Sequence, residues 1–191
     1  MRKIGIDIAD TIIDVWPSIM KEAEVFNKNN SNNPMIKDRH LYLPEDIYNW
    51  NEKEKEEFWK VYGSAITFNT PIKQDVVETL QYLKEIEYSI YFVTAKSNDI
   101  YKNLETKIIE MLRRYDIDYD EIYTQVSNKG TFCHEYDLDY LVDDSFDNCL
   151  KARNNGTTGI LLTKSYNYDR KLLDNMYRVE TFSDIKKYIK K

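Results

Sequence analysis

Polar side chains follow directly on apolar runs at three places in this 191-residue chain: at Asp7, at Thr94 and at the pair Asp143–Asp144. Lys129 lies just before the last of these runs, at the start of a helix-like segment. Crowded carboxylates repel one another and favour a bound cation, and their hard oxygen atoms suit Mg²⁺, which also shares its ligand shell with phosphate. A hydroxyl and an ammonium group would hold the remaining phosphate oxygens. Brought together, these side chains predict a phosphoryl-transfer site.

The elements that must position these residues are visible from residue 71 onwards, where short apolar runs alternate with helix-like segments. We expect strands at 4–8, 89–94, 121–126, 140–143 and 158–162, and helices at 74–86, 100–114, 146–153 and 183–189. This alternation predicts an α/β fold, with a Rossmann-like parallel sheet between helices. Right-handed crossovers bring the polar strand ends to one edge, and ligands bind beyond the carboxyl ends of such strands.

A simpler interpretation exists for each of these residues alone, because an acid at a strand end more often caps the next helix than it binds a ligand. The order of the acids, the hydroxyl and the lysine along a single edge changes that balance. Acids that perturb one another often mark functional sites. The combination therefore favours a site over a set of separate caps.

Residues 35–70 show no strand-like alternation. We expect helices at 16–26 and 51–62, a further helix start at Pro44, and a polar loop at 27–34. The segment predicts a small helical cap at 16–70, beside a core formed by residues 1–15 and 71–191.

Composition limits the class of protein. Hydrophobic residues make up 42% and charged residues 31%, which is ordinary for a globular protein. The net charge of −6 argues against a nucleic-acid partner, and no apolar run approaches the roughly 20 residues of a membrane helix. Two cysteines, Cys133 and Cys149, without a CxxC pair indicate a reducing, cytoplasmic location. The neighbouring Cys133 and His134 are too weak a pattern to predict zinc.

The motifs and their order resemble the haloacid dehalogenase (HAD) superfamily over nearly the whole chain. The matching residues are Asp7 to Thr11 for the first motif (DxDx[TV]), Thr94 for the second, Lys129 for the third and Asp143–Asp144 for the fourth. The resemblance implies a HAD core with a small helical cap and an enzyme that cleaves phosphate esters.

The resemblance also implies a role for each matching residue. Asp7 would be the nucleophile, and Thr94 and Lys129 would hold the phosphoryl oxygens. Asp7, the backbone carbonyl of Ala9 and Asp143 would hold Mg²⁺. Asp144 would be a further ligand or would accept a hydrogen bond behind the ligands.

Within the superfamily the chain looks most like the bacterial 5'(3')-deoxyribonucleotidase-like proteins. Thr94-Ala95-Lys96 resembles their Thr-Ala-Arg, and Ser165-Tyr166-Asn167 resembles their Pro-Tyr-Asn. This implies a small phosphorylated substrate such as a nucleoside monophosphate. The candidate substrate-binding residues are Asp10, Trp16, Thr94, Ala95, Lys96 and Lys129.

Aromatic residues in the expected cap have two interpretations. Trp50, Phe58 and Trp59 could stack on a base, but the more common alternative is that they form the core of the cap itself. Trp16, a few residues after Asp7, lies nearer to the expected site.

Ala9 departs from the family pattern, in which an Asp two residues after the nucleophile protonates the leaving oxygen and then activates water. Loss of a general acid/base typically lowers the rate by about 10²–10⁴-fold, so binding should survive while turnover falls. Three interpretations stay open: a natural binding protein that has lost catalysis, an engineered substitution, or a phosphonatase, whose Ala at this position goes with a Schiff-base lysine from the cap. Lys53, Lys55 and Lys60 are the lysines available for that role.

Overall fold

The structure is a computed structural model that describes residues 2–38 and 40–189. Its centre is a six-stranded sheet in the order β3-β2-β1-β4-β5-β6, and all neighbouring strands run parallel. The strands are β1 (Lys3–Ile6), β2 (Ser89–Val93), β3 (Glu121–Tyr123), β4 (Tyr140–Asp143), β5 (Thr158–Leu162) and β6 (Met176–Val179). The predicted α/β class with a parallel sheet is confirmed.

The strand order changes direction at β1, which lies between β2 and β4. In this register Ile6 lies beside Phe92 on one side and beside Val142 on the other. The chain leaves each of these strands at the same edge. A crevice at such a switch point is the usual ligand site of an open parallel sheet.

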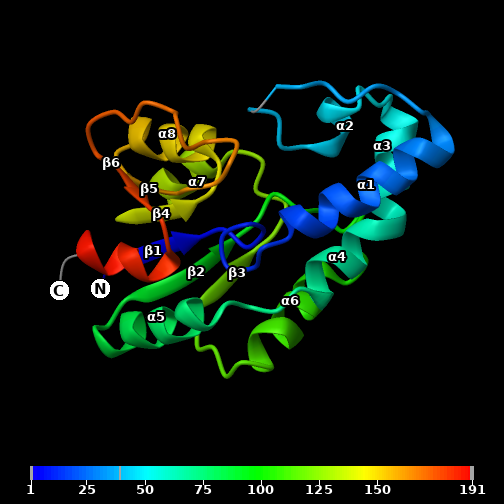
Figure 1. Cartoon of the computed structure of the whole chain (residues 1–191). Coiled ribbons are helices and arrows are strands. Elements are labelled where there is room, and N and C mark those ends of the chain that lie inside the picture. The colour runs from blue at the N-terminus through cyan, green and yellow to red at the C-terminus, as the bar shows by residue number, and fades with distance from the viewer. Residues whose placement is uncertain (1, 39, 190–191) are drawn as a thin grey trace.

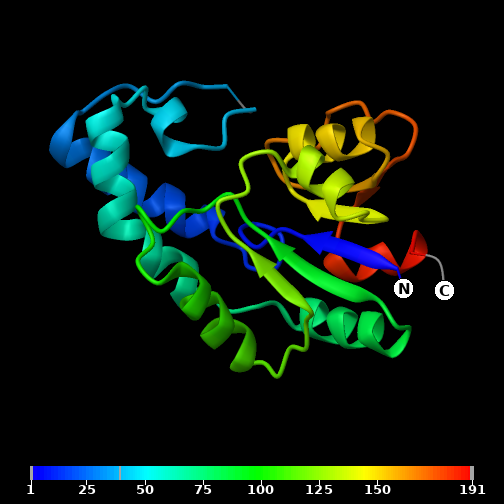
Figure 2. The same cartoon turned by 180° about the vertical axis from the view of Figure 1, so that it is seen from behind.

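Helices cover both faces of the sheet (Figures 1 and 2). One layer holds α7 (Lys129–Glu135) and α8 (Phe146–Asn154), and the opposite layer holds α5 (Gln74–Glu85) and the 3₁₀ helix η2 (Phe182–Lys187). A further helix, α6 (Leu104–Arg113), connects β2 to β3. Both faces of the sheet are therefore buried, which explains why its strands read as continuous apolar runs.

The helical segment before α5, residues 16–70, projects from one end of the sheet (Figure 1). It contains α1 (Trp16–Asn30), α2 (Pro44–Ile47), α3 (Glu52–Phe58), the π-helix η1 (Trp59–Gly63) and α4 (Ser64–Asn69). Its buried side chains join those of the sheet in one continuous apolar cluster. Within the described residues no helix is long and apolar enough to cross a membrane.

Aromatic side chains form the core of this helical segment. The rings of Phe26, Trp50 and Phe58 contact one another, with centroids 4.9–5.6 Å apart. Trp59 packs against Phe58 at 5.1 Å and donates its indole N–H to the carboxylate of Glu45 at 3.1 Å. Trp50, Phe58 and Trp59 thus have the core role that was the alternative to base stacking.

Two boundaries in the helical segment differ from the prediction. The prediction of a polar loop at 27–34 is wrong for residues 27–30, because α1 continues to Asn30. Asn27 is buried and accepts the indole N–H of Trp50 at 3.0 Å, a tertiary contact that keeps this polar residue in the helix. The single helix expected at 51–62 is α3 followed by η1.

The core also contains differences. β6 was not predicted, the expected final α-helix is the 3₁₀ helix η2, and β3 ends at Tyr123 instead of residue 126. The helix expected at 100–114 begins only at Leu104, because Asn103 has a left-handed φ of 56° and the Asn98 side chain accepts the Leu104 N–H. Sequence patterns predict which segments form helices and strands better than they predict where these elements end, because single side-chain contacts determine the ends.

Gly130 allows the close approach of α7 and α8. A Cβ atom added there would lie 2.6 Å from the carbonyl oxygen of Lys151 in α8. This contact places the first turn of α7, and so the backbone of Lys129, against the neighbouring helix.

We expect Gly130→Ala to lower the free energy of unfolding by about 1–3 kcal/mol through overpacking. The gain in helix propensity, up to about 1 kcal/mol, opposes this loss. Urea unfolding measures the net effect. Thr131→Ala, an exposed position in the same helix, is the matched control. Equal stability of the two variants would contradict the close packing.

Candidate active site

The carboxyl ends of β1 and β4 are bridged by the side chain of Lys129. Its ammonium group, only 3% exposed, donates to Asp7 Oδ1 and to Asp143 Oδ2, the latter at 2.6 Å. Asp7 and Asp143 are both buried. One buried cation thus lies between two buried anions at the sheet edge where the sequence placed them, although an ion pair between Lys129 and these acids was not predicted.

Burial and neighbouring charges act on this trio in opposite directions. For Asp7, burial is the largest effect and raises its pKa to about 6, with the charge of Lys129 opposing and that of Asp143 adding to the shift. For Lys129, burial lowers the pKa, but Asp143 and Asp7 outweigh it and the pKa is raised. The shared ammonium therefore stays charged, while each carboxylate has only a share of it.

Asp143 is oriented by further donors. Its Oδ1 accepts the backbone N–H of Ser145 at 2.8 Å, and the Asn148 amide lies 3.2 Å from Oδ1 and 3.1 Å from Oδ2. Ser145 also begins α8, where its hydroxyl accepts the Asn148 N–H. The acid at the end of β4 therefore takes part both in the turn into α8 and in the charged site.

Asp144 is held from two other parts of the chain. Its Oδ2 accepts the hydroxyl of Tyr166 at 2.5 Å, and its Oδ1 accepts that of Thr11 at 3.3 Å. The amide of Asn167 donates to its backbone carbonyl at 2.7 Å. Burial is the main reason that the pKa of Asp144 is raised, and the charges of Asp143 and Asp7 add to it.

Three carboxylates are placed so that they could share a cation. One oxygen from each of Asp7, Asp143 and Asp144 lies within 4.8 Å of the other two, and all three residues are buried. Buried acids need compensating charge, and hard oxygen donors suit Mg²⁺. The donor set fits a magnesium ion, and no other such group occurs among the residues that the structure describes.

The residues after β2 contact β3 and the helical segment, and a part of Thr94 in phosphate binding stays a prediction. Thr94 is buried, its backbone N–H donates to the carbonyl of Tyr123, and its hydroxyl accepts the backbone N–H of Lys96 at 3.3 Å. The Lys96 ammonium donates to the Tyr101 hydroxyl at 2.9 Å and lies 5.7 Å from the ring of Trp59. Ala95 is exposed. Lys96 thus connects this loop to η1.

The loop after β1 holds the remaining candidates. Asp10 has a left-handed φ of 56°, which Asp adopts more readily than most residues. Its carboxylate accepts the backbone N–H of Trp16 at 2.9 Å and so closes the turn into α1. The Trp16 ring meets Tyr166 edge to face at 5.6 Å, and Ala9 is half-buried. A part in substrate binding for Asp10 or Trp16 stays a prediction.

Sequence reasoning did not assign a role to Thr11, Asn148 or Tyr166. Thr11 stands inside the first motif and Tyr166 inside the Ser-Tyr-Asn triplet, so both had a signal. Nothing in the sequence indicates that either hydroxyl reaches Asp144, since that contact depends on how two loops meet.

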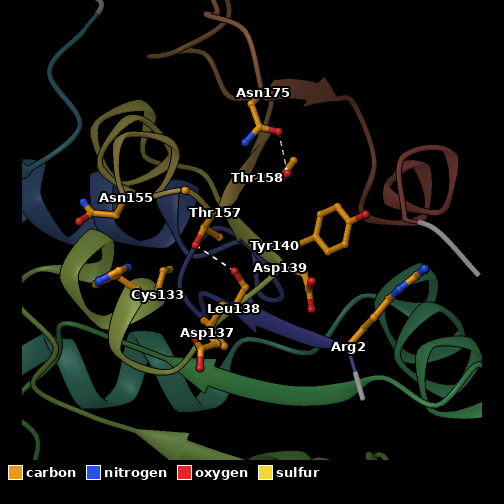
Figure 3. Close-up of a pocket in the computed structure, with 12 residues that line it drawn as sticks. Arg2, Cys133, Asp137, Leu138, Asp139, Tyr140, Asn155, Thr157, Thr158 and Asn175 are labelled. Atoms are coloured by element: carbon orange, nitrogen blue, oxygen red, sulfur yellow. Dashed lines mark hydrogen bonds between the residues drawn. The ribbon is translucent and has the colours of Figure 1, made fainter.

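A separate polar cavity of about 580 Å³ lies at the opposite edge, beside the first residues of β4 and β5 (Figure 3). Arg2, Asp139 and Asn175 line it, together with Cys133 and His134. Asp7, Lys129, Asp143 and Asp144 are not among the residues that line this cavity.

In the absence of added metal, the free energy of unfolding should depend on pH through Asp7. Its pKa is about 6 in the folded protein and 3.8 in an unperturbed chain, so the folded state binds the proton more tightly. Stability is therefore greatest below about pH 4 for this group and falls as pH rises to about 6. We expect Asp7→Asn to remove on the order of 1–3 kcal/mol of this fall, as measured by denaturant unfolding in EDTA.

The control for this measurement is Asp99→Asn, which changes an exposed acid in the loop after β2. That variant should keep the pH dependence of the unchanged protein. The same slope in Asp7→Asn would show that folding does not raise the pKa of Asp7.

The chain is similar to several known proteins in sequence or in structure. No family model matches the chain. A curated protein of Oceanobacillus iheyensis named "Putative nucleotidase OB0422" is 27% identical over 176 residues, which cover 90% of this chain and 92% of that protein.

Solved structures are similar over almost the full length. A "predicted phosphoglycolate phosphatase" from Haemophilus somnus has a TM-score of 0.69 at 19% identity and covers 98% of this chain and 97% of its own. A "haloacid dehalogenase-like family protein" from Streptococcus pneumoniae has a TM-score of 0.67 at 14% identity, with 98% of both chains covered. The chain therefore has the fold of the haloacid dehalogenase superfamily of hydrolases.

Proposed function

We propose that this protein is an Mg²⁺-dependent phosphomonoesterase of the HAD type, with a nucleotidase-like preference for small phosphates. The observation that carries the proposal is the buried Lys129 between Asp7 and Asp143, with Asp144 beside them. A cation, a nucleophile and metal-binding carboxylates at one strand edge are the parts that phosphoryl transfer requires.

The proposed chemistry begins with Asp7. One of its carboxylate oxygens attacks phosphorus in line, the ester bond to the leaving oxygen breaks, and an aspartyl-phosphate forms. Water then attacks phosphorus, releases phosphate and regenerates Asp7. Lys129 and the hydroxyl of Thr94 stabilise the charge on the phosphoryl oxygens. Magnesium, held by Asp7, Asp143, Asp144 and the carbonyl of Ala9, would neutralise further negative charge.

Proton transfer is the weak point of this site. The leaving oxygen needs a proton and the attacking water must lose one, but the methyl group of Ala9 can do neither. The carboxylate of Asp10, the next residue, accepts a hydrogen bond from the backbone N–H of Trp16. We therefore propose slow turnover with intact binding of metal and phosphate.

The nucleotidase-like preference is supported by the curated relative at 27% identity, whose name says nucleotidase. The helical segment at 16–70 would act as the cap that selects the substrate. Trp16 is the tryptophan nearest to the acidic cluster through its contact with Tyr166. Trp50 and Trp59 are occupied in the core of the segment.

A second candidate is a non-catalytic protein that binds phosphates or nucleotides with the same residues. Ala9 is the specific observation in its favour, because it removes the proton carrier and leaves the binding groups in place. The phosphonatase interpretation is weaker. Lys55 and Lys60 form ion pairs with glutamates on their own helical turns, and Lys53 is exposed.

Magnesium should stabilise the folded protein, because its proposed ligands meet only when the strand ends are assembled. We expect the melting temperature to rise with MgCl₂ and expect Asp143→Asn to abolish most of this rise. Differential scanning calorimetry measures both. Asp139→Asn, at the other end of β4, should respond to magnesium like the unchanged protein. An equal response of Asp143→Asn would remove Asp143 from the metal site.

Ala9→Asp tests the mechanism itself. We expect the unchanged chain to hydrolyse a panel of nucleoside monophosphates weakly or not at all, and Ala9→Asp to raise the rate on the order of 10²-fold or more. Phosphate release measures the rate. Asp7→Asn in the Ala9→Asp background should remove the gain, since the covalent intermediate forms on Asp7.

Ala9→Asn provides the matched control, because it has the shape of Asp without its proton chemistry. Fast turnover by the unchanged chain would mean that another residue supplies the proton. No gain in Ala9→Asp on any nucleotide or on an aryl phosphate would favour the non-catalytic binding protein.

A further inference from the structure

Tyr166, in the loop after β5, contacts the acidic cluster through its hydroxyl and is held by neighbouring aromatic rings. Its ring is buried and its hydroxyl donates to Asp144 Oδ2 at 2.5 Å. A carboxylate oxygen has two lone pairs, so this bond leaves one free to face a cation. The hydroxyl fixes the rotation of a carboxylate that belongs to the proposed metal site.

Two other aromatic residues hold the ring of Tyr166. Tyr42 stacks on it with centroids 5.0 Å apart and an angle of 28°. Trp16 contacts it edge to face at 5.6 Å. The ring thus has a partner on its face and another at its edge, and both come from the helical segment, whereas Tyr166 belongs to the core.

Tyr42 lies in the segment between α1 and α2, which reaches from the helical bundle towards the core. His40 of the same segment places its Nδ1 atom 3.4 Å from the backbone carbonyl of Tyr166 and 3.8 Å from Asp169 Oδ1. The segment therefore contacts the Tyr166 loop through a ring and through a side-chain nitrogen. Tyr42 itself is 38% exposed.

We infer that Tyr166 is a positioning residue for the metal-binding carboxylate of Asp144, and that Tyr42 holds it in place from the helical segment. This inference rests on the proposed function, because it concerns the proposed metal site. A group that orients a ligand from behind typically affects metal affinity by about 10–100-fold. The contact makes the affinity of the site depend on whether the segment before α2 is docked.

Tyr166→Phe tests this inference, since it removes the hydroxyl and keeps the stacked ring. We expect it to weaken Mg²⁺ binding about tenfold or more, as measured by isothermal titration calorimetry with the metal alone. Tyr42→Ala keeps the hydroxyl of Tyr166 but removes the ring that stacks on Tyr166. We expect it to weaken Mg²⁺ binding less than Tyr166→Phe does. Tyr42→Phe retains the ring but loses the hydrogen bond of its hydroxyl with the Ser145 side chain, and it should weaken Mg²⁺ binding less than Tyr42→Ala does.

Tyr140→Phe is the matched control for a lost tyrosine hydroxyl. Tyr140 is buried at the other end of β4, and its hydroxyl donates to the backbone carbonyl of Tyr188 at 3.4 Å. A merely structural effect would lower the melting temperature of either Phe variant without changing the dissociation constant for Mg²⁺. Of Tyr166→Phe and Tyr140→Phe, we expect only Tyr166→Phe to change the dissociation constant.

The outcomes separate this inference from the proposed function. If the unchanged protein binds Mg²⁺ and Tyr166→Phe binds it equally well, the inference is overturned while the proposed function stands. If the unchanged protein does not bind Mg²⁺, the proposed function fails and the inference fails with it. Should Tyr166→Phe not fold, equal Mg²⁺ affinity of Tyr42→Ala and Tyr42→Phe would overturn the coupling to the helical segment.

Discussion

Lys129 is the residue on which the charged edge of the sheet depends. Two buried carboxylates at neighbouring strand ends would repel each other at high cost without the ammonium between them. Loss of one partner from such a buried set costs about 3–5 kcal/mol. The close approach of α7 and α8 at Gly130 places this lysine. The packing of α7 against α8 therefore determines where the positive charge of Lys129 lies relative to Asp7 and Asp143.

The rest of the site follows from the change of direction in the strand order. Because β1 lies between β2 and β4, the chain returns to the same crevice from both sides, with Asp7 in the middle. Hydroxyl groups from Thr11 and Tyr166 then fix Asp144, which makes the loops after β1 and β5 part of the same arrangement. These hydrogen bonds orient the carboxylate of Asp144 from two loops.

Ala9 separates two properties that usually occur together in such a site. In the proposed mechanism, binding of a cation and a phosphate depends on charge and orientation, and the proposed binding groups are Asp7, Asp143, Asp144, Thr94 and Lys129. Proton transfer would need a titratable side chain at position 9, where the chain has the methyl group of Ala9. The proposal therefore predicts a site that binds its ligands but turns over slowly.

The sequence by itself determined that Asp7, Thr94 and Asp143 lie at the ends of strands of one parallel sheet, since each of them follows or ends an apolar run. It could not predict β6 or the extension of α1 through Asn27, because those depend on partners far along the chain. Only the tertiary structure decided that Tyr166 reaches Asp144 across 22 residues. The physical reason is that periodicity records which face of an element is buried, whereas a side-chain hydrogen bond between loops depends on the path of the whole chain.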